Sequence, residues 1–392
     1  MLFRRQRAGA EAPAERKASA VGTLVAFAGP GRAAWGPRDE VSLAKAGYVG
    51  NAVAFRSVRM VAEAAAAVPF RLSSEGRAVS DHPVLALLAE PNQGQDGAGL
   101  LEALYGHLML FGDAYLEAAG FDERGAPSEL HTLRPDRVRI APGPDGWPEA
   151  YEYRVGARSH RFDMTTEAQP ILHLRGFHPL DDHYGLAPLE AAAGAIEIHN
   201  AAGKWSKGLL DNAARPSGAL VYKGEGGATL SDEQFRRIVA ELEDGHQGAR
   251  NAGRPMLLEG GLDWKPMGFS PSDMEFLKTK EAAAREIALA FGVPPQLLGL
   301  PGDNAYSNYQ EANRAFYRQT VLPLVRRAGA ALAGWLGWRW GERLRLLPDL
   351  DAIPALQAER EAQWRRIAAA EFLTEAEKRQ MLGLPPLPEA GA

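Results

Sequence analysis

The sequence of 392 residues contains no cysteine, which excludes disulfide bonds and cysteine-ligated metal sites. This absence fits a reducing cytoplasm and is equally compatible with a particle that is assembled there and released later. The chain also lacks any run of about 18 to 20 apolar residues, the length that a membrane-spanning helix needs. Its basic first 20 residues contain no apolar stretch long enough for a secretory signal. We therefore expect no membrane as a partner.

A strongly basic composition is also missing, since the formal net charge is −5. A protein that reads a nucleic-acid sequence normally presents a concentrated basic face. The acidic balance argues against such a reader, but it is compatible with a protein past which DNA slides. Weak attraction suits that task, because each phosphate that is neutralised adds affinity and therefore friction.

Sequence motifs for catalysis are absent as well. There is no phosphate-binding loop of the nucleotide-hydrolase type, no nucleophile elbow and no His-Glu-x-x-His helix. We therefore expect no enzymatic activity and no cofactor. The best metal candidate is the triple His173, His178 and His183 beside Asp181 and Asp182. A metal-dependent enzyme built on this triple remains an alternative to ordinary polar loop residues.

The order of apolar patterns predicts an α+β fold. Residues 1–40, rich in Ala, Gly, Pro and charge, are expected to have little fixed structure. Short alternating runs bounded by Gly, Pro or Asp predict strands over residues 116–174. Helices are expected at residues 51–67, 82–90, 99–111 and 188–210.

Three later helices carry local start signals. Ser231 with Gln234 and Ser307 with Gln310 have the spacing of capping boxes, and Ser270 stands before a proline suited to the first helical turn. The helix from Ser307 contains Pro323, which we expect to kink it.

Narrow apolar stripes mark the two helices that begin near Ser231 and Ser270. Their opposite faces carry mixed charges, a pattern typical of bundle or subunit-contact helices and also of ordinary surface helices. The residues that we assign to subunit contacts are Phe235, Ile238, Leu242, Ile287 and Phe291. Between these helices, residues 245–269 predict either a simple β-hairpin insertion or a projecting tip for docking other proteins, carrying Arg250, Asn251, Arg254 and Lys265.

Several segments, in order, resemble the portal proteins of tailed bacteriophages, in the subfamily that includes portals of gene transfer agents. The resemblance covers about residues 41–385. It is carried by NAVAFRSVRMVAEAAAAVPF, HPVLALLAEPNQ, LFGDAYLE, ELHTLRPDRVRI, YGLAPLEAAAGAIEIHNAAGKWSKGLLDNAARPSGAL, LSDEQFRRIVAELEDGHQGARNAGRPMLLEGGLDWKPM, REIALAFGVPPQLLG, YSNYQEANRAFYRQTVLPLV and LTEAEKRQMLGLPPL.

The resemblance implies a ring, typically of twelve subunits, at one capsid vertex of a virion or gene transfer agent particle. Double-stranded DNA would pass through it without sequence recognition during packaging and ejection. The implied partners are the terminase large subunit, the head-tail adaptor and the major capsid protein. The short chain and its Ala, Gly and Arg content favour a gene transfer agent or a compact prophage. A minor capsid or adaptor protein without a channel is the alternative.

Carried onto this chain, the family architecture gives a portal fold with wing, stem, clip and crown. The DNA-facing residues of its tunnel loop would be Gly302, Asp303, Asn304, Tyr306, Ser307 and Asn308, with no Lys or Arg among them. The parts would be a tail at 1–40, a wing at 41–228, stem helices at 229–292 with a clip at 248–269, a tunnel loop region at 293–308, a kinked helix and strand at 309–350, and a small crown at 351–392.

Overall fold

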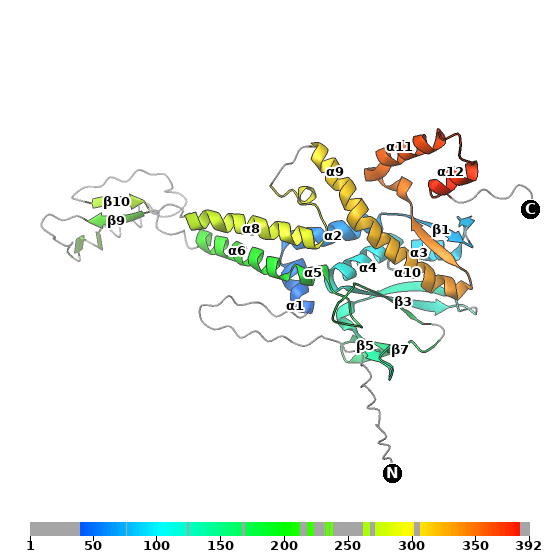
Figure 1. The fold of residues 1–392 in the computed structure, drawn as a ribbon. Helices are drawn as coiled ribbons and strands as arrows, with labels where there is room; N and C mark the ends of the chain where they lie inside the picture. Colours follow the sequence, from blue (N-terminus) through cyan, green and yellow to red (C-terminus); the bar gives the residue numbers. More distant parts are fainter. Residues whose placement is uncertain are drawn as a thin grey trace, which may run out of the picture. The chain divides into compact units, whose positions relative to one another are not determined.

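The computed structural model describes residues 40–75, 77–123, 125–166, 169–211, 218–222, 231, 233–234, 236–237, 262–266, 271–301 and 306–384. The chain divides into two units, one formed by residues 1–196 and 284–392 and the other by residues 197–283. Figure 1 shows the ribbon coloured along the sequence. Among the described residues, no helix combines the length and the apolar character that crossing a membrane requires.

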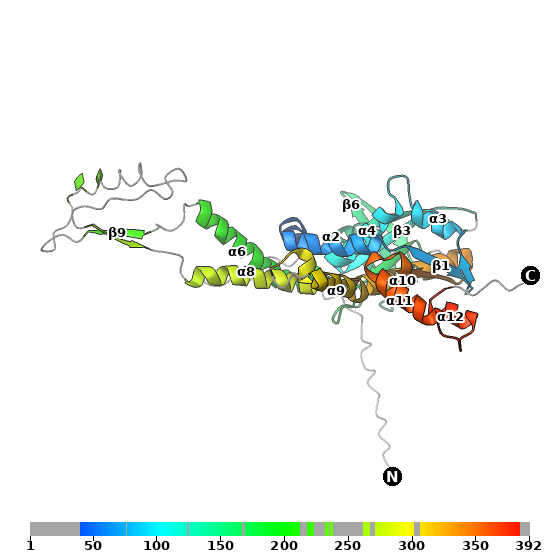
Figure 2. The ribbon, with the colours of Figure 1, turned by 90° about the horizontal axis from the view of Figure 1, so that it is seen from above.

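Two long helices with polar caps pack together in the first unit. Helix α2 (Ala52–Ala66) begins where the Asn51 side chain accepts the N–H groups of Val53 and Ala54, both at 3.0 Å. Helix α4 (Gly97–Phe111) begins where Asp96 accepts the Gly99 N–H at 2.7 Å. Figures 1 and 2 show the two helices side by side. The prediction at 51–67 is confirmed, and the helix expected at 99–111 starts two residues earlier.

Smaller elements flank these helices. They are α1 (Glu40–Ala44), the π-helical turn η1 (Lys45–Val49), α3 (Pro83–Ala89), the 3-10 turn η2 (Pro135–Arg137) and α5 (Pro188–Ala191). The helix expected at 188–210 is in fact two helices, since α5 ends before α6 (Ala193–Asp211) begins.

Three antiparallel three-stranded sheets belong to the first unit, with strand orders β11-β1-β2, β4-β3-β8 and β5-β6-β7. The strands predicted between residues 116 and 174 are confirmed. Six side chains form a buried cluster spanning the second and third sheets: Tyr115, Leu133, Val138, Tyr151, Phe162 and Ile171. The strands are β1 (Phe70–Ser74), β2 (Arg77–Val79), β3 (Asp113–Phe121), β4 (Pro127–Leu133), β5 (Val138–Pro142), β6 (Pro148–Val155), β7 (Arg158–Asp163), β8 (Ile171–Arg175) and β11 (Leu344–Pro348).

A bent helical rod closes this unit. Helix α9 (Tyr306–Phe316) continues through the π-helical segment η5 (Tyr317–Val321) into α10 (Leu322–Trp340). The irregular segment stands just before Pro323, where the sequence predicts a kink. Helix α9 starts one residue before Ser307, so Ser307 lies in its first turn.

The C-terminal elements are the 3-10 turns η6 (Leu350–Ala352) and η7 (Pro354–Leu356) and helices α11 (Gln357–Ala368) and α12 (Glu375–Met381). The buried Arg360 holds them together, because its guanidinium lies 2.6 Å from Asp351 and donates to the Leu382 carbonyl at 3.0 Å. A capping box between Thr374 and Glu377 starts α12.

The second unit contains most of α6, the first part of α8 (Pro271–Ala290), and the antiparallel pair β9 (Gly218–Tyr222) and β10 (Leu262–Pro266). The Trp205 and Phe276 rings stack with centroids 4.4 Å apart. The capping box at Ser231 is confirmed: the Ser231 N–H donates to Gln234 Oε1 at 3.0 Å and the Gln234 N–H donates to Ser231 Oγ at 3.3 Å.

Candidate functional site

The last turns of α8 are fixed by burial within the first unit. Ile287 is fully buried, Phe291 is 3% exposed, and Ala284 and Ala288 complete the stripe. The predicted stripe is confirmed, but its assigned role is wrong for Ile287 and Phe291. Side chains without accessible surface cannot contact a second chain, so these two belong to the protomer's own core.

Gly292 ends α8 in a left-handed conformation, with φ of +65°. A Cβ atom added there would lie 2.6 Å from Thr320 Oγ1, so no side chain fits without displacement. The Thr320 hydroxyl donates to the Gly292 carbonyl at 2.6 Å. This contact ties the end of α8 to η5, the irregular segment of the bent rod.

The chain from 293 to 308, called loop 293–308 here, leaves from this tie. It begins with the buried Val293, forms the 3-10 turn η4 (Pro295–Leu298) and reverses at Gly299, whose φ is +70°. The Arg285 side chain donates to the Pro301 carbonyl, which fixes the incoming side of the loop. The outgoing side enters α9 at Tyr306. Two helices therefore position both ends of the loop.

The cationic side chains around loop 293–308 are all engaged within the described chain. The described residues 284–301 and 306–320 contain three cations, Arg285, Arg314 and Arg318. Arg285 is bonded to the Pro301 carbonyl, Arg314 pairs with Glu311, and Arg318 lies 2.9 Å from Glu359. Each guanidinium is thus engaged by an oxygen of the chain.

The predicted loop residues fall partly inside the described chain. Tyr306 is the first residue of α9, and Ser307 and Asn308 are exposed in its first turn. Gly302, Asp303 and Asn304 lie outside the described residues, as do Arg250, Asn251 and Arg254 and three residues predicted to make subunit contacts, Phe235, Ile238 and Leu242. Lys265 lies on β10 opposite Ala219 of β9.

The three histidines of the metal alternative have separate environments. His173 Nε2 lies 2.7 Å from Asp113 Oδ1 and its Nδ1 lies 3.2 Å from the Tyr151 hydroxyl. His178 Nδ1 accepts the Leu180 N–H at 3.1 Å. His183 is buried, and neither of its ring nitrogens has a hydrogen-bond partner in the described chain. No group of three or more His, Cys, Asp or Glu side chains among the described residues is arranged to hold a metal ion.

The Asp113 contact network is a feature that the sequence did not predict. Both Asp113 carboxylate oxygens accept the Gly185 N–H at 3.0 Å, so one buried side chain binds His173 and the following loop. The Tyr115 ring stacks on His173 with centroids 4.3 Å apart. Burial raises the pKa of Tyr151 to about 12, so its hydroxyl stays protonated and can donate.

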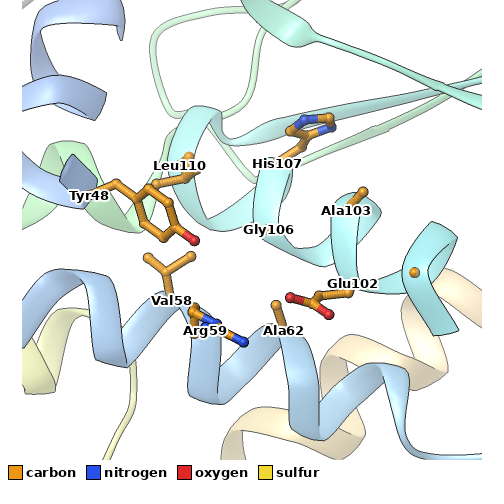
Figure 3. A pocket seen from close by; sticks show the side chains of 10 residues that line it. Tyr48, Val58, Arg59, Ala62, Glu102, Ala103, Gly106, His107 and Leu110 are labelled. Atoms are coloured by element: carbon orange, nitrogen blue, oxygen red, sulfur yellow. The ribbon is translucent and has the colours of Figure 1, made fainter.

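A pocket lies between α2 and α4 (Figure 3). Its lining residues are distant in sequence from loop 293–308. Figure 3 shows the Tyr48 hydroxyl and the Glu102 carboxylate directed toward its centre, with Arg59 on the α2 side. Burial raises the pKa of Tyr48. His107 lines the same pocket; its Nδ1 is buried and unpartnered in the described chain, and burial lowers its pKa to about 4.

The chain is similar to a known family of proteins. The family model described as "Phage portal protein" matches residues 52–383. An uncharacterized protein of Rickettsia bellii is 40% identical over 356 residues, covering 90% of this chain and 91% of its own length. The portal protein of Enterobacteria phage HK97 is 26% identical over 312 residues, covering 78% and 71%.

Solved structures are also similar. A chain in the neck of an empty gene transfer agent particle, with C6 symmetry, is 62% identical with a TM-score of 0.77, covering 91% of this chain and 96% of its own. A chain in the native neck, with C12 symmetry, is 61% identical with a TM-score of 0.74, covering 92% and 97%. The family model spans residues 52–383, which is most of the sequence. The chain therefore belongs to the phage portal protein family.

Proposed function

We propose that this chain is the portal subunit of a gene transfer agent particle, forming a ring that joins head and tail and through which double-stranded DNA passes during packaging and ejection. The observation that carries this proposal is the 61–62% identity, over more than nine tenths of both chains, to proteins in gene transfer agent necks. The C12 symmetry of one of those necks supports a ring of twelve copies.

Loop 293–308 is the segment that we propose faces the DNA, through Gly302, Asp303, Asn304, Tyr306, Ser307 and Asn308. Support comes from its two fixed ends, the Gly292–Thr320 tie and the Arg285–Pro301 contact. The engaged arginines nearby support a surface that touches a moving phosphate backbone without gripping it, because retention grows with each neutralised phosphate.

The remaining parts follow from family membership. In this proposal residues 41–228 form the wing, 229–292 the stem with the clip at 248–269, 309–350 the brace and 351–392 the crown. The clip, with Arg250, Asn251, Arg254 and Lys265, would dock the terminase large subunit and later the head-tail adaptor. The major capsid protein would surround the ring.

Electron microscopy of the purified protein tests the proposal. We expect rings with a central hole, and a native mass that is a multiple of 42.3 kDa, twelvefold for a C12 ring. A compact monomer at every concentration, and in the assembled particle, would refute it. Particles with the protein bound outside any channel would instead identify an adaptor or minor capsid protein.

A further inference from the structure

An apolar side chain is left in solvent at the end of α8. Leu289 is 78% exposed, although its neighbours Ile287 and Ala288 are completely buried. It stands three residues before Gly292, where the chain turns toward loop 293–308. The burial of the opposite face fixes the helix in this rotation, so the first unit cannot cover Leu289 without breaking its own core.

A groove lies on the same unit between α2, η4 and α9. Its apolar lining includes Met60, Ala64, Leu297, Tyr309 and Phe316, and Arg56 stands at its edge. Tyr309 is 47% exposed there. The groove is therefore a surface that could receive an apolar side chain of about the size of leucine.

We propose that Leu289 of each subunit packs into this groove on the next subunit of the ring. The proposal rests on the proposed portal function. A cyclic ring uses two different patches of each chain, one on each side, in a head-to-tail contact. Here an exposed knob and an open groove are present on one chain, which fits such a contact.

Symmetry restricts which patches can meet. Rotation about an axis leaves the height of every atom along that axis unchanged, so two patches that pair in a ring must lie at nearly equal heights in the protomer. Leu289 precedes loop 293–308, Leu297 lies within it, and Tyr309 directly follows it. Leu289 and the groove residues Leu297 and Tyr309 therefore lie within or beside loop 293–308, the arrangement that the proposed contact needs for nearly equal heights. The more exposed Phe177 and Phe372 have no such relation to a groove beside this loop.

Charges beside the two patches are complementary. Glu286 is exposed and lies one helical turn before Leu289. The Arg56 side chain at the groove is 54% exposed and lies 3.5 Å from Glu63, a carboxylate that also lines the groove; the exposed guanidinium is the part that Glu286 would meet. In the proposed contact, the Glu286 carboxylate of one subunit is placed beside Arg56 of the next. This attraction also favours one order of subunits over the reverse.

Disulfide trapping tests the contact directly, because the natural chain has no cysteine. Chains carrying Leu289→Cys and chains carrying Tyr309→Cys, with different affinity tags, are co-assembled and oxidised. We expect mixed dimers bearing both tags, and none between two chains of the same variant. As the control, Leu289→Cys is paired with Trp147→Cys, which is 59% exposed on the β5–β6 turn, and yields no mixed dimer.

A charge exchange supplies the second test. We expect Glu286→Arg to lower the yield of rings by about tenfold near the midpoint of assembly, because it places like charges together. Adding Arg56→Glu should restore the yield to within about twofold of the natural protein. Both positions are exposed, and a surface ion pair such as that of Arg56 with Glu63 contributes little to stability, so the thermal midpoint of the isolated protomer should change little.

The outcomes separate the two proposals. Rings that form normally but give no mixed dimer, or a double exchange that fails to restore assembly, overturn the knob-and-groove contact and leave the portal function standing. Failure of the natural chain to form rings under any condition overturns the portal function itself.

Discussion

Replacing Asp113 tests whether one buried carboxylate holds the loop after β8 in place. Its side chain is 3% exposed; it lies 2.7 Å from His173 Nε2 and accepts the Gly185 N–H at 3.0 Å. Asp113→Ala leaves two buried donors without an acceptor, each costing about 1–3 kcal/mol. We expect a loss of about 2–6 kcal/mol in the free energy of unfolding, the sum of the costs of the two unsatisfied donors.

The conservative change separates charge from geometry. Asp113→Asn keeps one oxygen that can accept the Gly185 N–H but loses the negative charge beside His173. We expect it to cost about 1–2 kcal/mol, less than the alanine variant. Asp163→Ala serves as the matched control, since Asp163 is an exposed strand-end carboxylate bonded to Thr165, and should change stability far less.

Urea unfolding of the protomer under non-assembling conditions measures these differences, because assembly would add a concentration-dependent contribution. The midpoint should fall while the denaturant slope stays constant. If Asp113→Ala loses less than about 1 kcal/mol, the carboxylate does not sustain these two contacts and the reasoning is refuted.

Three further outcomes are expected. Burial lowers the pKa of His107 to about 4 from an ordinary 6.5, so as the pH falls the unfolded chain takes up a proton at this residue before the folded chain does. The free energy of unfolding should therefore fall by up to about 3 kcal/mol between pH 6.5 and pH 4. His107→Leu should reduce this pH dependence, measured by urea unfolding at several pH values. Thr320→Val removes the donor to the Gly292 carbonyl at nearly constant volume and should cost about 1 kcal/mol, measured as a lower thermal midpoint; an unchanged midpoint contradicts the tie. Asp303→Lys with Asn304→Lys should slow DNA packaging, most strongly at low salt. Each phosphate that a lysine neutralises adds about 0.9 to the slope with which the logarithm of the DNA-binding constant falls against the logarithm of the salt concentration. A packaging rate that is unaffected at every salt concentration argues against DNA contact by this loop.

Local signals predicted much of the fold. The helix at 51–67, the end of the helix at 99–111 and the capping box at Ser231 depend on a few adjacent residues, so the sequence is sufficient to place them. The alternating runs of the sheets are equally local. The same reasoning missed the break at Ala192 and the true start of α9, because single residues at helix ends differ by little in free energy.

Long-range contacts could not be predicted in this way. Asp113 and His173 are 60 residues apart and meet only because β3 and β8 pair with Asp113 opposite Arg175. No periodicity marks that register beforehand. Likewise, the stripe of α8 shows that Ile287 and Phe291 share a face, but only the packed structure shows that the protomer itself covers them.

The π-helical turn at Tyr317–Val321 lets the α9–η5–α10 rod hold one residue more than a regular α-helix of the same course would. A π-helical turn accommodates one residue more than a regular α-helical turn, while the helices before and after it keep their own orientation. Removing the exposed Gln319 should therefore let α9 and α10 merge into one regular helix without rotating the core-facing side chains Phe316 and Val325 away from their neighbours. The natural chain keeps the extra residue, and with it Thr320 stands where its hydroxyl reaches the end of α8.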